Sequence, residues 1–340
     1  MTNMTTVDLF AIGNALIDQE FKVSYEFLTQ QALQKGTMQL TDGETQAALY
    51  QQLQDTQNYI GQASGGSAAN TTVAFSALGG TAFYGCRVGN DDLGSIYLNG
   101  LNEAGIKTAA QSISEGVTGT CMVLISPDSE RTMHTYLGIT AELTAEQIDF
   151  EPLKAAKWLY IEGYLSTSDT ARVAVKQARE LAKAHGVKIA LSLSDPAMVQ
   201  YARQGLEELL DDGVDLLFCN EQEALMFSNT ETLDAAIEVL KSKNQHIVIT
   251  QGANGAVIID PEQQFHVAGR EVHAVDTNGA GDAFAGAFLY AINAGLTLKA
   301  AAQLAILISS EVVAQFGPRL AVENYAKLFE QFKNSQQEYA

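Results

Sequence analysis

A glycine-rich turn near the C-terminal end of the chain has the residue types of an anion-binding site. The segment Val275–Asp282 (VDTNGAGD) runs from an extended pattern into an apolar helical pattern that begins at Ala283. The N–H groups in the first turn of a helix have no intrahelical partner, and the helix dipole favours negative charge there. Glycine lets the backbone approach a ligand closely. The turn bracketed by Gly279 and Gly281 therefore predicts an anion hole.

Asp282 is an unusual residue to find beside a bound phosphate. One interpretation is structural, since aspartate is favoured at the N-cap and in the first turn of a helix. The other is catalytic: a carboxylate beside a phosphate can take the proton from an attacking hydroxyl, as an aspartate does in kinase catalytic loops. The spacing alone leaves both interpretations open.

Other catalytic and phosphate-binding motifs are absent from the sequence. There is no GxxxxGK[ST] segment, and Phe284 stands where a dinucleotide-binding turn requires glycine or alanine. There is also no G-x-S-x-G nucleophile turn and no HExxH zinc motif. These absences exclude a P-loop protein and give no support to a dinucleotide enzyme, an α/β-hydrolase or a zinc protease.

A second glycine cluster opens another helical pattern. The residues Gly65, Gly66, Ser67 and Asn70 precede an amphipathic stretch that reaches Leu78. Taken alone, this cluster is equally well explained by a tight junction between a loop and a helix.

Short β-branched or aromatic runs alternate with helical patterns along most of the chain. This alternation is typical of a largely parallel sheet covered by helices on both faces. The expected strands are Val7–Gly13, Thr81–Val88, Trp158–Ile161, Val187–Leu193, Asp215–Cys219 and His246–Thr250.

Two segments interrupt this alternation. Residues 15–61 mix short strand patterns with helical ones. Within residues 107–140, the turn Pro127–Glu130 separates two extended runs, which is typical of a β-hairpin. We expect these two segments to form a small β-sheet lid on a single domain that spans residues 1–340.

The composition limits the class of protein and its partners. Hydrophobic residues make up 46% of the 340 residues, and the formal net charge of −20 argues against nucleic acid or anionic membranes as partners. The first residues have no signal-peptide pattern, and no apolar run approaches the ~20 residues of a membrane helix. With three scattered cysteines, these features predict a cytoplasmic protein whose thiols are reduced.

The order of four motifs resembles the ribokinase-like PfkB carbohydrate kinases. The motifs are Gly65–Gly80 (GGSAANTTVAFSALGG), Asn220–Glu223 (N-x-x-E), Thr250–Gly255 (T-x-G-x-x-G) and Asp276–Phe288 (DTNGAGDAFAGAF). The resemblance implies a three-layer α/β/α sandwich with a β-sheet lid. It also implies an ATP-dependent phosphotransferase with an alcohol group as acceptor.

The resemblance implies roles for individual residues of the catalytic and nucleotide-binding motifs. Asp282 would be the general base, and Gly279, Ala280 and Gly281 would form the anion hole for the transferring phosphoryl group. Asn220 and Glu223 would organise Mg²⁺ and phosphate, with Glu223 reaching Mg²⁺ through water. Without the family resemblance, the sequence would predict that Asn220 is only a helix cap and that Glu223 is an exposed acid in the first helical turn. The residues that would line the ATP site are Thr250, Gly252 and Gly255.

The resemblance also implies an acceptor site. Asp18 would bind vicinal sugar hydroxyls, since a carboxylate accepts two charge-assisted hydrogen bonds. Asn278 would contact a ribose, and Arg131 would close onto the phosphates or the substrate, although a solvated charge on the hairpin explains Arg131 equally well. Apolar lid surface for a base would come from Phe21, Met38, Met133 and Tyr136, although ordinary packing within the lid explains these residues equally well. The remaining residues expected at the acceptor are Asn14, Gly65, Gly66 and Asn70.

Within the family, the pattern is closest to adenosine and nucleoside kinases, so the expected acceptor is the 5′-hydroxyl of adenosine or a related nucleoside. The alternative is a kinase for a free sugar such as ribose, fructose or a keto-deoxy sugar acid. A silent nucleoside or sugar sensor is a rival from another class, and a homodimer through the lid would accompany any of these. The C-terminal loop Phe316–Ala321 lacks the hydroxyl residue common in potassium-activated ribokinases, so dependence on K⁺ stays open.

Overall fold

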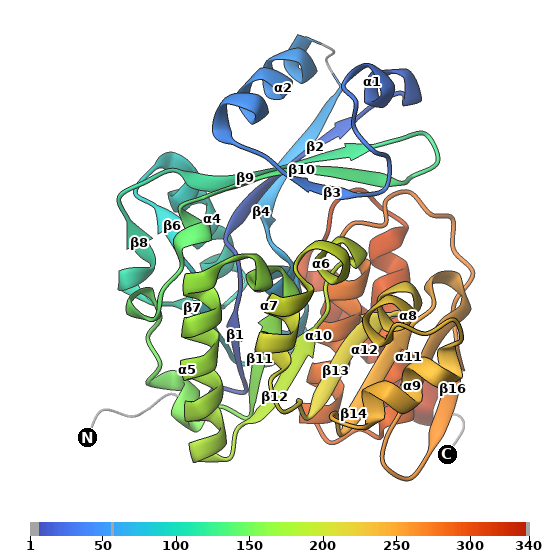
Figure 1. The fold of residues 1–340 in the computed structure, drawn as a ribbon. Coiled ribbons are helices and arrows are strands. Elements are labelled where there is room, and N and C mark those ends of the chain that lie inside the picture. The colour runs from blue at the N-terminus through green and yellow to red at the C-terminus, as the bar shows by residue number, and fades with distance from the viewer. Residues whose placement is uncertain (1–6, 56–57, 338–340) are drawn as a thin grey trace.

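A nine-stranded sheet forms the centre of the protein (Figure 1). The computed structural model describes residues 7–55 and 58–337. The strands pair in parallel from β7 to β14, and β15 and β16 add an antiparallel edge. In spatial order they are β16 (Gln264–Ala268), β15 (Gly255–Ile259), β14 (His246–Thr250), β13 (Leu216–Asn220), β12 (Lys188–Ser192), β11 (Trp158–Glu162), β1 (Leu9–Ile12), β5 (Ala82–Gly85) and β7 (Lys107–Thr108).

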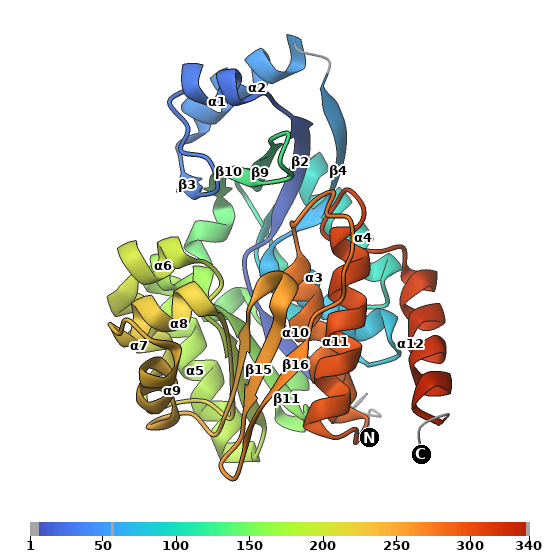
Figure 2. The ribbon, with the colours of Figure 1, turned by 90° about the vertical axis from the view of Figure 1, so that its right-hand side faces the viewer.

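Helices cover both faces of this sheet (Figure 2). One apolar core lies under α3 (Ser67–Ala77), α4 (Asp92–Glu103), α10 (Ala280–Asn293), α11 (Leu298–Val313) and α12 (Val322–Gln337). The second core lies under α5 (Asp169–His185), α6 (Pro196–Tyr201), α7 (Arg203–Leu210), α8 (Glu221–Ser228) and α9 (Leu233–Lys241). The three-layer α/β/α arrangement predicted from the sequence is therefore confirmed. Within the described residues, no helix is both long and apolar enough to cross a membrane.

A five-stranded small sheet lies beyond the carboxyl ends of the main strands (Figure 1). Its order is β3 (Met38–Leu40), β10 (Arg131–Gly138), β9 (Thr118–Ile125), β2 (Leu16–Lys22) and β4 (Tyr59–Gly65). The hairpin of β9 and β10 is antiparallel as predicted, whereas β2 pairs with β9 in parallel. The outer face of the small sheet packs under α1 (Tyr25–Gln30) and α2 (Gly43–Asp55).

Two predicted boundaries are wrong. The second lid segment, expected from residue 107, joins the small sheet only at Thr118, because β7 pairs with β5 of the main sheet. The strand expected over Thr81–Val88 divides at Cys86, and its last part becomes β6 (Val88–Gly89), which pairs with β8 (Ile113–Ser114). The 3₁₀ turns are Ala110–Ser112, Ile139–Glu142, Ala145–Gln147, Pro152–Ala155, Gly163–Thr167 and Gly252–Asn254.

Candidate active site

A cavity of about 380 Å³ lies between the small sheet and the carboxyl ends of the main strands. This edge of a parallel sheet is where α/β proteins usually bind ligands. Four adjacent main strands contribute their last residues to the cavity wall, and the small sheet closes the other side. These last residues are Glu162 of β11, Ser192 of β12, Asn220 of β13 and Thr250 of β14.

The predicted anion-hole turn forms the start of α10. Gly279 is the N-cap in the left-handed conformation, with φ of 71°, and a Cβ there would lie 2.3 Å from the carbonyl oxygen of Pro318. Only glycine satisfies both constraints, so the turn is tightly specified. Gly279 and Gly281 line the cavity, whereas Ala280, the first residue of α10, does not appear in its wall. The unpaired N–H groups of this first turn make it a suitable place for a phosphoryl group.

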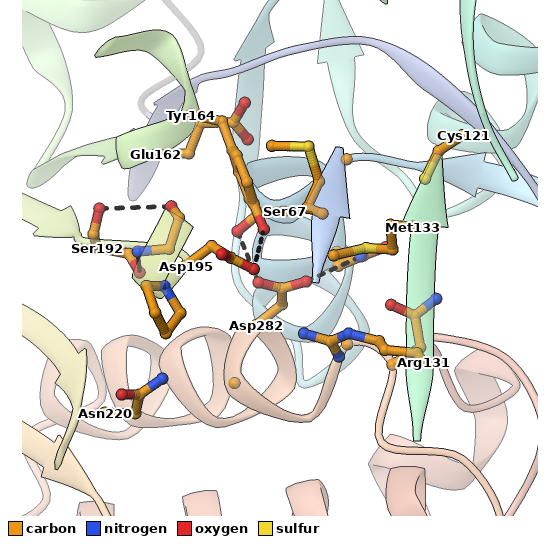
Figure 3. A pocket seen from close by; sticks show the side chains of 18 of the residues that line it. Ser67, Cys121, Arg131, Met133, Glu162, Tyr164, Ser192, Asp195, Asn220 and Asp282 are labelled. Carbon is orange, nitrogen blue, oxygen red and sulfur yellow. Dashed lines mark hydrogen bonds between the residues drawn. The ribbon is translucent and has the colours of Figure 1, made fainter. Parts of the chain in front are cut away.

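Asp282 lies in the first turn of α10 but does not cap the helix. Its carboxylate instead reaches the start of α3, where the Ser67 hydroxyl donates to Oδ1 at 2.6 Å (Figure 3). Asn70 Nδ2 donates to Oδ2 at 2.9 Å. Asp282 also lines the cavity. Burial raises the pKa of Asp282, and these two hydrogen bonds oppose the increase. A half-buried carboxylate oriented by two donors is well placed to accept a proton.

The loop before α10 is held from two directions. Arg131 on β10 of the small sheet lines the cavity and donates from Nη1 to the carbonyl oxygen of Thr277 at 2.7 Å. The buried Asp276 carboxylate accepts from the backbone N–H groups of Asn278 and Gly317 at 2.8 and 2.9 Å. Arg131 is therefore not the solvated hairpin charge of the alternative interpretation. Asn278, expected to contact a ribose, lies in the cavity wall.

The residues expected at the acceptor meet where β2 and the start of α3 approach each other. Asp18 on β2 is buried, and burial raises its pKa to about 7. A Cβ on Gly65 would lie 2.1 Å from Asp18 Cγ, and one on Gly66 would lie 2.4 Å from the Asn14 carbonyl oxygen. The two glycines thus allow the chain to pass against the acceptor loop. Asp18, Asn14, Gly66 and Asn70 line the cavity, whereas Gly65 supports Asp18 from behind.

Glu162 connects this acceptor loop to α3. Its buried carboxylate accepts from the backbone and side-chain nitrogens of Asn14 at 2.7 and 2.9 Å, and from the backbone N–H of Ala68 at 2.7 Å. Burial raises the pKa of Glu162 to about 7 despite these donors.

Asn220 and Glu223 form a reciprocal capping box at the start of α8. The Asn220 amide donates to Glu223 Oε1 at 2.7 Å, and the Glu223 N–H donates to Asn220 Oδ1 at 2.8 Å. The helix-cap interpretation of Asn220 is therefore confirmed, yet both residues also line the cavity. Glu223 is buried rather than exposed, and burial raises its pKa to about 8.

The residues of the predicted nucleotide motif Thr250–Gly255 have two different structural roles. Thr250 and Gly252 line the cavity, but Gly255 does not appear in its wall. Gly255 begins β15 with φ of 101°, and a Cβ there would lie 2.0 Å from the Val267 carbonyl oxygen. The structure therefore gives Gly255 a strand-pairing role.

Several residues of the cavity were not predicted as site residues. Ser67, Glu162, Tyr164 and Asp195 belong to its wall. Asp195 accepts from Tyr164 Oη at 3.4 Å and caps α6 (Figure 3). Glu162 ends one buried strand and Asp195 closely follows another, so their positions at the carboxyl ends of parallel strands are the signal that would have found them.

Not all of the expected lid residues face the cavity. Met38 and Met133 line it, as do Leu16, Leu40 and Leu137. Phe21 packs instead in the outer core of the small sheet, and the Tyr136 ring lies against Gly43. The three cysteines are free and buried, and the described residues hold no cluster of three or more His, Cys, Asp or Glu side chains suited to a metal ion.

Comparison with known proteins identifies relatives of the whole chain. The chain is 33% identical to the adenosine kinase from Sinorhizobium meliloti, with a TM-score of 0.90 over 96% of this chain and 99% of that one. A probable sugar kinase protein from Rhizobium etli is 32% identical, with a TM-score of 0.90 and the same coverage. The adenosine kinase of Saccharomyces cerevisiae is 28% identical over 95% of this chain and the whole of its own length. Residues 7–324 match the pattern of the pfkB family carbohydrate kinases, and the chain belongs to this family.

Proposed function

We propose that this chain transfers the γ-phosphoryl group of ATP to the 5′-hydroxyl of adenosine or a related nucleoside. The observation that carries the proposal is the position of Asp282, at the start of α10 and in the wall of a cavity between the small sheet and the main sheet. Asp18 on β2 lines this cavity from the small sheet, and Asn220 at the end of β13 lines it from the main sheet. The similarity to the Sinorhizobium meliloti and Saccharomyces cerevisiae adenosine kinases supports the same acceptor.

The acceptor would bind under the small sheet. Asp18 and Asn14 present a carboxylate and an amide for ribose hydroxyls, and Asn278 adds a further amide. The inner face of the small sheet is apolar in this region, which suits the faces of a purine better than the hydroxyls of a free sugar. The apolar residues in this part of the cavity wall are Leu16, Met38, Leu40, Met133 and Leu137.

The chemical step would need a base, an anion hole and correct positioning. Asp282 takes the proton from the 5′-hydroxyl as its oxygen attacks the γ-phosphorus, and Ser67 and Asn70 keep the carboxylate oriented. The N–H groups at the start of α10, beside Gly279 and Gly281, stabilise the negative charge of the transferring group.

The opposite end of the cavity would bind the nucleotide. Thr250 and Gly252 line it on β14 and the turn that follows. Asn220 and Glu223 offer amide and carboxylate oxygens, the donor types that Mg²⁺ prefers, and would hold the ion through water. When bound, Mg²⁺ supplies positive charge that offsets the phosphate oxygens. A comparison of activity in NaCl and in KCl buffer measures whether the reaction also depends on a monovalent cation.

We also propose that residues 1–340 work as one domain with the small sheet as its lid. The contact from Arg131 to Thr277 connects the small sheet to the loop before α10. Closure of the small sheet over the acceptor would exclude water, which otherwise competes for the phosphoryl group.

An ATP-coupled assay over a panel of acceptors tests this proposal. Adenosine should give the highest kcat/KM, and ribose, fructose and keto-deoxy sugar acids should give much lower values. A free sugar that outperforms adenosine would replace the nucleoside assignment with the sugar kinase alternative, which the similarity to the Rhizobium etli protein keeps relevant. Nucleoside binding without ADP formation would instead indicate a sensor.

A further inference from the structure

Arg319 lies in the C-terminal loop Phe316–Ala321, between α11 and α12, and is not among the site residues expected from the sequence. The loop is fixed close to the candidate active site. Gly317 N–H donates to Asp276 at 2.9 Å, and Gln315 Nε2 donates to the Arg319 carbonyl oxygen at 2.7 Å. Arg319 itself does not appear among the residues that line the cavity. Any role of Arg319 in the reaction must therefore act through a residue that lines the cavity.

Asn70 is that residue. Arg319 Nε donates to Asn70 Oδ1 at 2.7 Å, and Asn70 Nδ2 donates to Asp282 Oδ2 at 2.9 Å. A guanidinium group only donates hydrogen bonds, so it forces the Asn70 carbonyl oxygen to face it. The amide nitrogen must then face Asp282. Without this constraint, the Asn70 side chain can rotate so that its oxygen faces the Asp282 carboxylate, an arrangement that repels.

We infer that Arg319 is a positioning residue for phosphoryl transfer, which acts through Asn70 to fix the orientation of the Asp282 carboxylate. The inference rests on the proposed role of Asp282 as the base. It adds a residue from a third segment of the chain to the Ser67 and Asn70 contacts of α3.

The charge of Arg319 has a second consequence for the same carboxylate. Burial raises the pKa of Asp282, whereas the positive charges of Arg131 and Arg319 lower it. Arg319 Nη2 is inaccessible to solvent and has no hydrogen-bond partner among the described residues, so little water screens this charge. The other titratable groups whose charge acts on or with Asp282 are Asp18, Tyr160, Glu162, Tyr164 and Tyr325.

Loss of the Arg319 charge should therefore affect both the rate and its pH dependence. In Arg319→Met, which keeps apolar volume without charge or donors, kcat with adenosine should fall about ten- to hundredfold. The acid limb of the kcat–pH profile should move to higher pH, and KM for ATP should stay near the wild-type value. Arg319→Lys keeps the charge and should restore the pH profile. Arg270→Met is the control. Arg270 is exposed on the surface, with Nη1 3.8 Å from Glu311 Oε1, and the kinetics of this variant should match those of the wild type.

A double-mutant cycle with Asn70→Ala separates positioning from general damage. If Arg319 positions Asp282 through Asn70, adding Arg319→Met to Asn70→Ala should lower kcat no further at a pH above the acid limb, where the Asp282 carboxylate is ionised in every variant. Additive losses, or an unshifted acid limb in Arg319→Met, would overturn the inference. Should Arg319→Met fail to fold, Arg319→Gln, which also lacks the charge, replaces it in the cycle with the same requirement of non-additivity.

The same experiments distinguish this inference from the function on which it depends. Normal turnover in Asp282→Asn would rule out both the assignment of Asp282 as the base and the positioning role of Arg319. An inactive Asp282→Asn combined with additive effects of Arg319 and Asn70 would remove only the positioning role.

Discussion

The proposed reaction depends on two carboxylates in the cavity wall, that of Asp18, which is buried, and that of Asp282, which is half-buried. Burial raises the pKa of each, so each needs nearby donors or positive charge to stay ionised. Asp282 has Ser67 and Asn70 as donors. Asp18 has the charges of Arg131 and Arg319 nearby, which lower its pKa.

The first prediction concerns Asp18. In Asp18→Asn, the side chain keeps its shape but loses the charge that strengthens hydrogen bonds from ribose hydroxyls. We expect KM for adenosine to rise about ten- to hundredfold, with a smaller change in kcat, since a hydrogen bond to a charged group contributes about 1.5–3 kcal/mol. Steady-state kinetics at saturating ATP measure this. An unchanged KM would place the acceptor elsewhere in the cavity.

At the scale of the elements, close backbone approaches determine how the site residues meet. A Cβ on Gly286 of α10 would lie 2.2 Å from the Thr71 carbonyl oxygen of α3, so glycine lets these two helices touch. This packing brings Asp282 to Ser67 and Asn70, which are more than two hundred positions away in the sequence.

The second prediction concerns Gly65 on β4, whose backbone lies against the Asp18 carboxylate. A Cβ on Gly65 would lie 2.1 Å from Asp18 Cγ, whereas one on Gly61 of the same strand has no atom within 4 Å. Gly65→Ala should displace the Asp18 carboxylate, raise KM for adenosine about tenfold or more, and lower the free energy of unfolding by about 1–3 kcal/mol. Kinetics and chemical denaturation measure the two effects. Gly61→Ala is the matched control and should change neither; equal behaviour of the two variants would show that the approach at Gly65 carries no function.

Local features of this chain could be predicted from the sequence, whereas contacts between distant segments could not. The anion-hole turn and the hairpin were predictable, because glycine spacing and turn residues act within a few positions. The pairing of Asp282 with Ser67 and the approach of Arg319 to Asn70 were not, since tertiary packing alone brings those segments together. The motif likewise does not reveal the contact of Gly255 with Val267, because that contact depends on strand pairing.

At the scale of the whole molecule, the net charge of −20 and the binding of a polyanion are compatible because the cavity has its own donors. Arg131 lines the cavity, Arg319 lies behind its wall, and the start of α10 adds backbone N–H groups. Local groups in a partly enclosed site act more strongly than distant, solvated surface charges.

The third prediction concerns stability and pH. Burial raises the pKa of Asp18, Glu20 and Glu162 to about 7 and that of Glu223 to about 8, from ordinary values of 3.8 and 4.5. Between those values the folded protein holds protons that the unfolded chain has released, so stability is greatest at the acid side and is lost as pH rises. The Tm of the ligand-free protein should fall by a few degrees from pH 5.5 to pH 8.

Differential scanning calorimetry measures this dependence, and Asp18→Asn provides the comparison. Because that variant has one fewer group that titrates on folding, its Tm should fall less steeply over the same range. A Tm that rises from pH 5.5 to pH 8 would mean that these carboxyls are ionised in the folded protein.

The most direct test of the account is the turnover of Asp282→Asn. ADP formation with adenosine and ATP should fall about 10²- to 10⁴-fold, while calorimetry should give an adenosine dissociation constant within a few-fold of the wild type. Asp92→Asn, in the first turn of α4 and exposed, is the control and should retain full activity. Turnover near the wild-type rate in Asp282→Asn would contradict the assignment of Asp282 as the base.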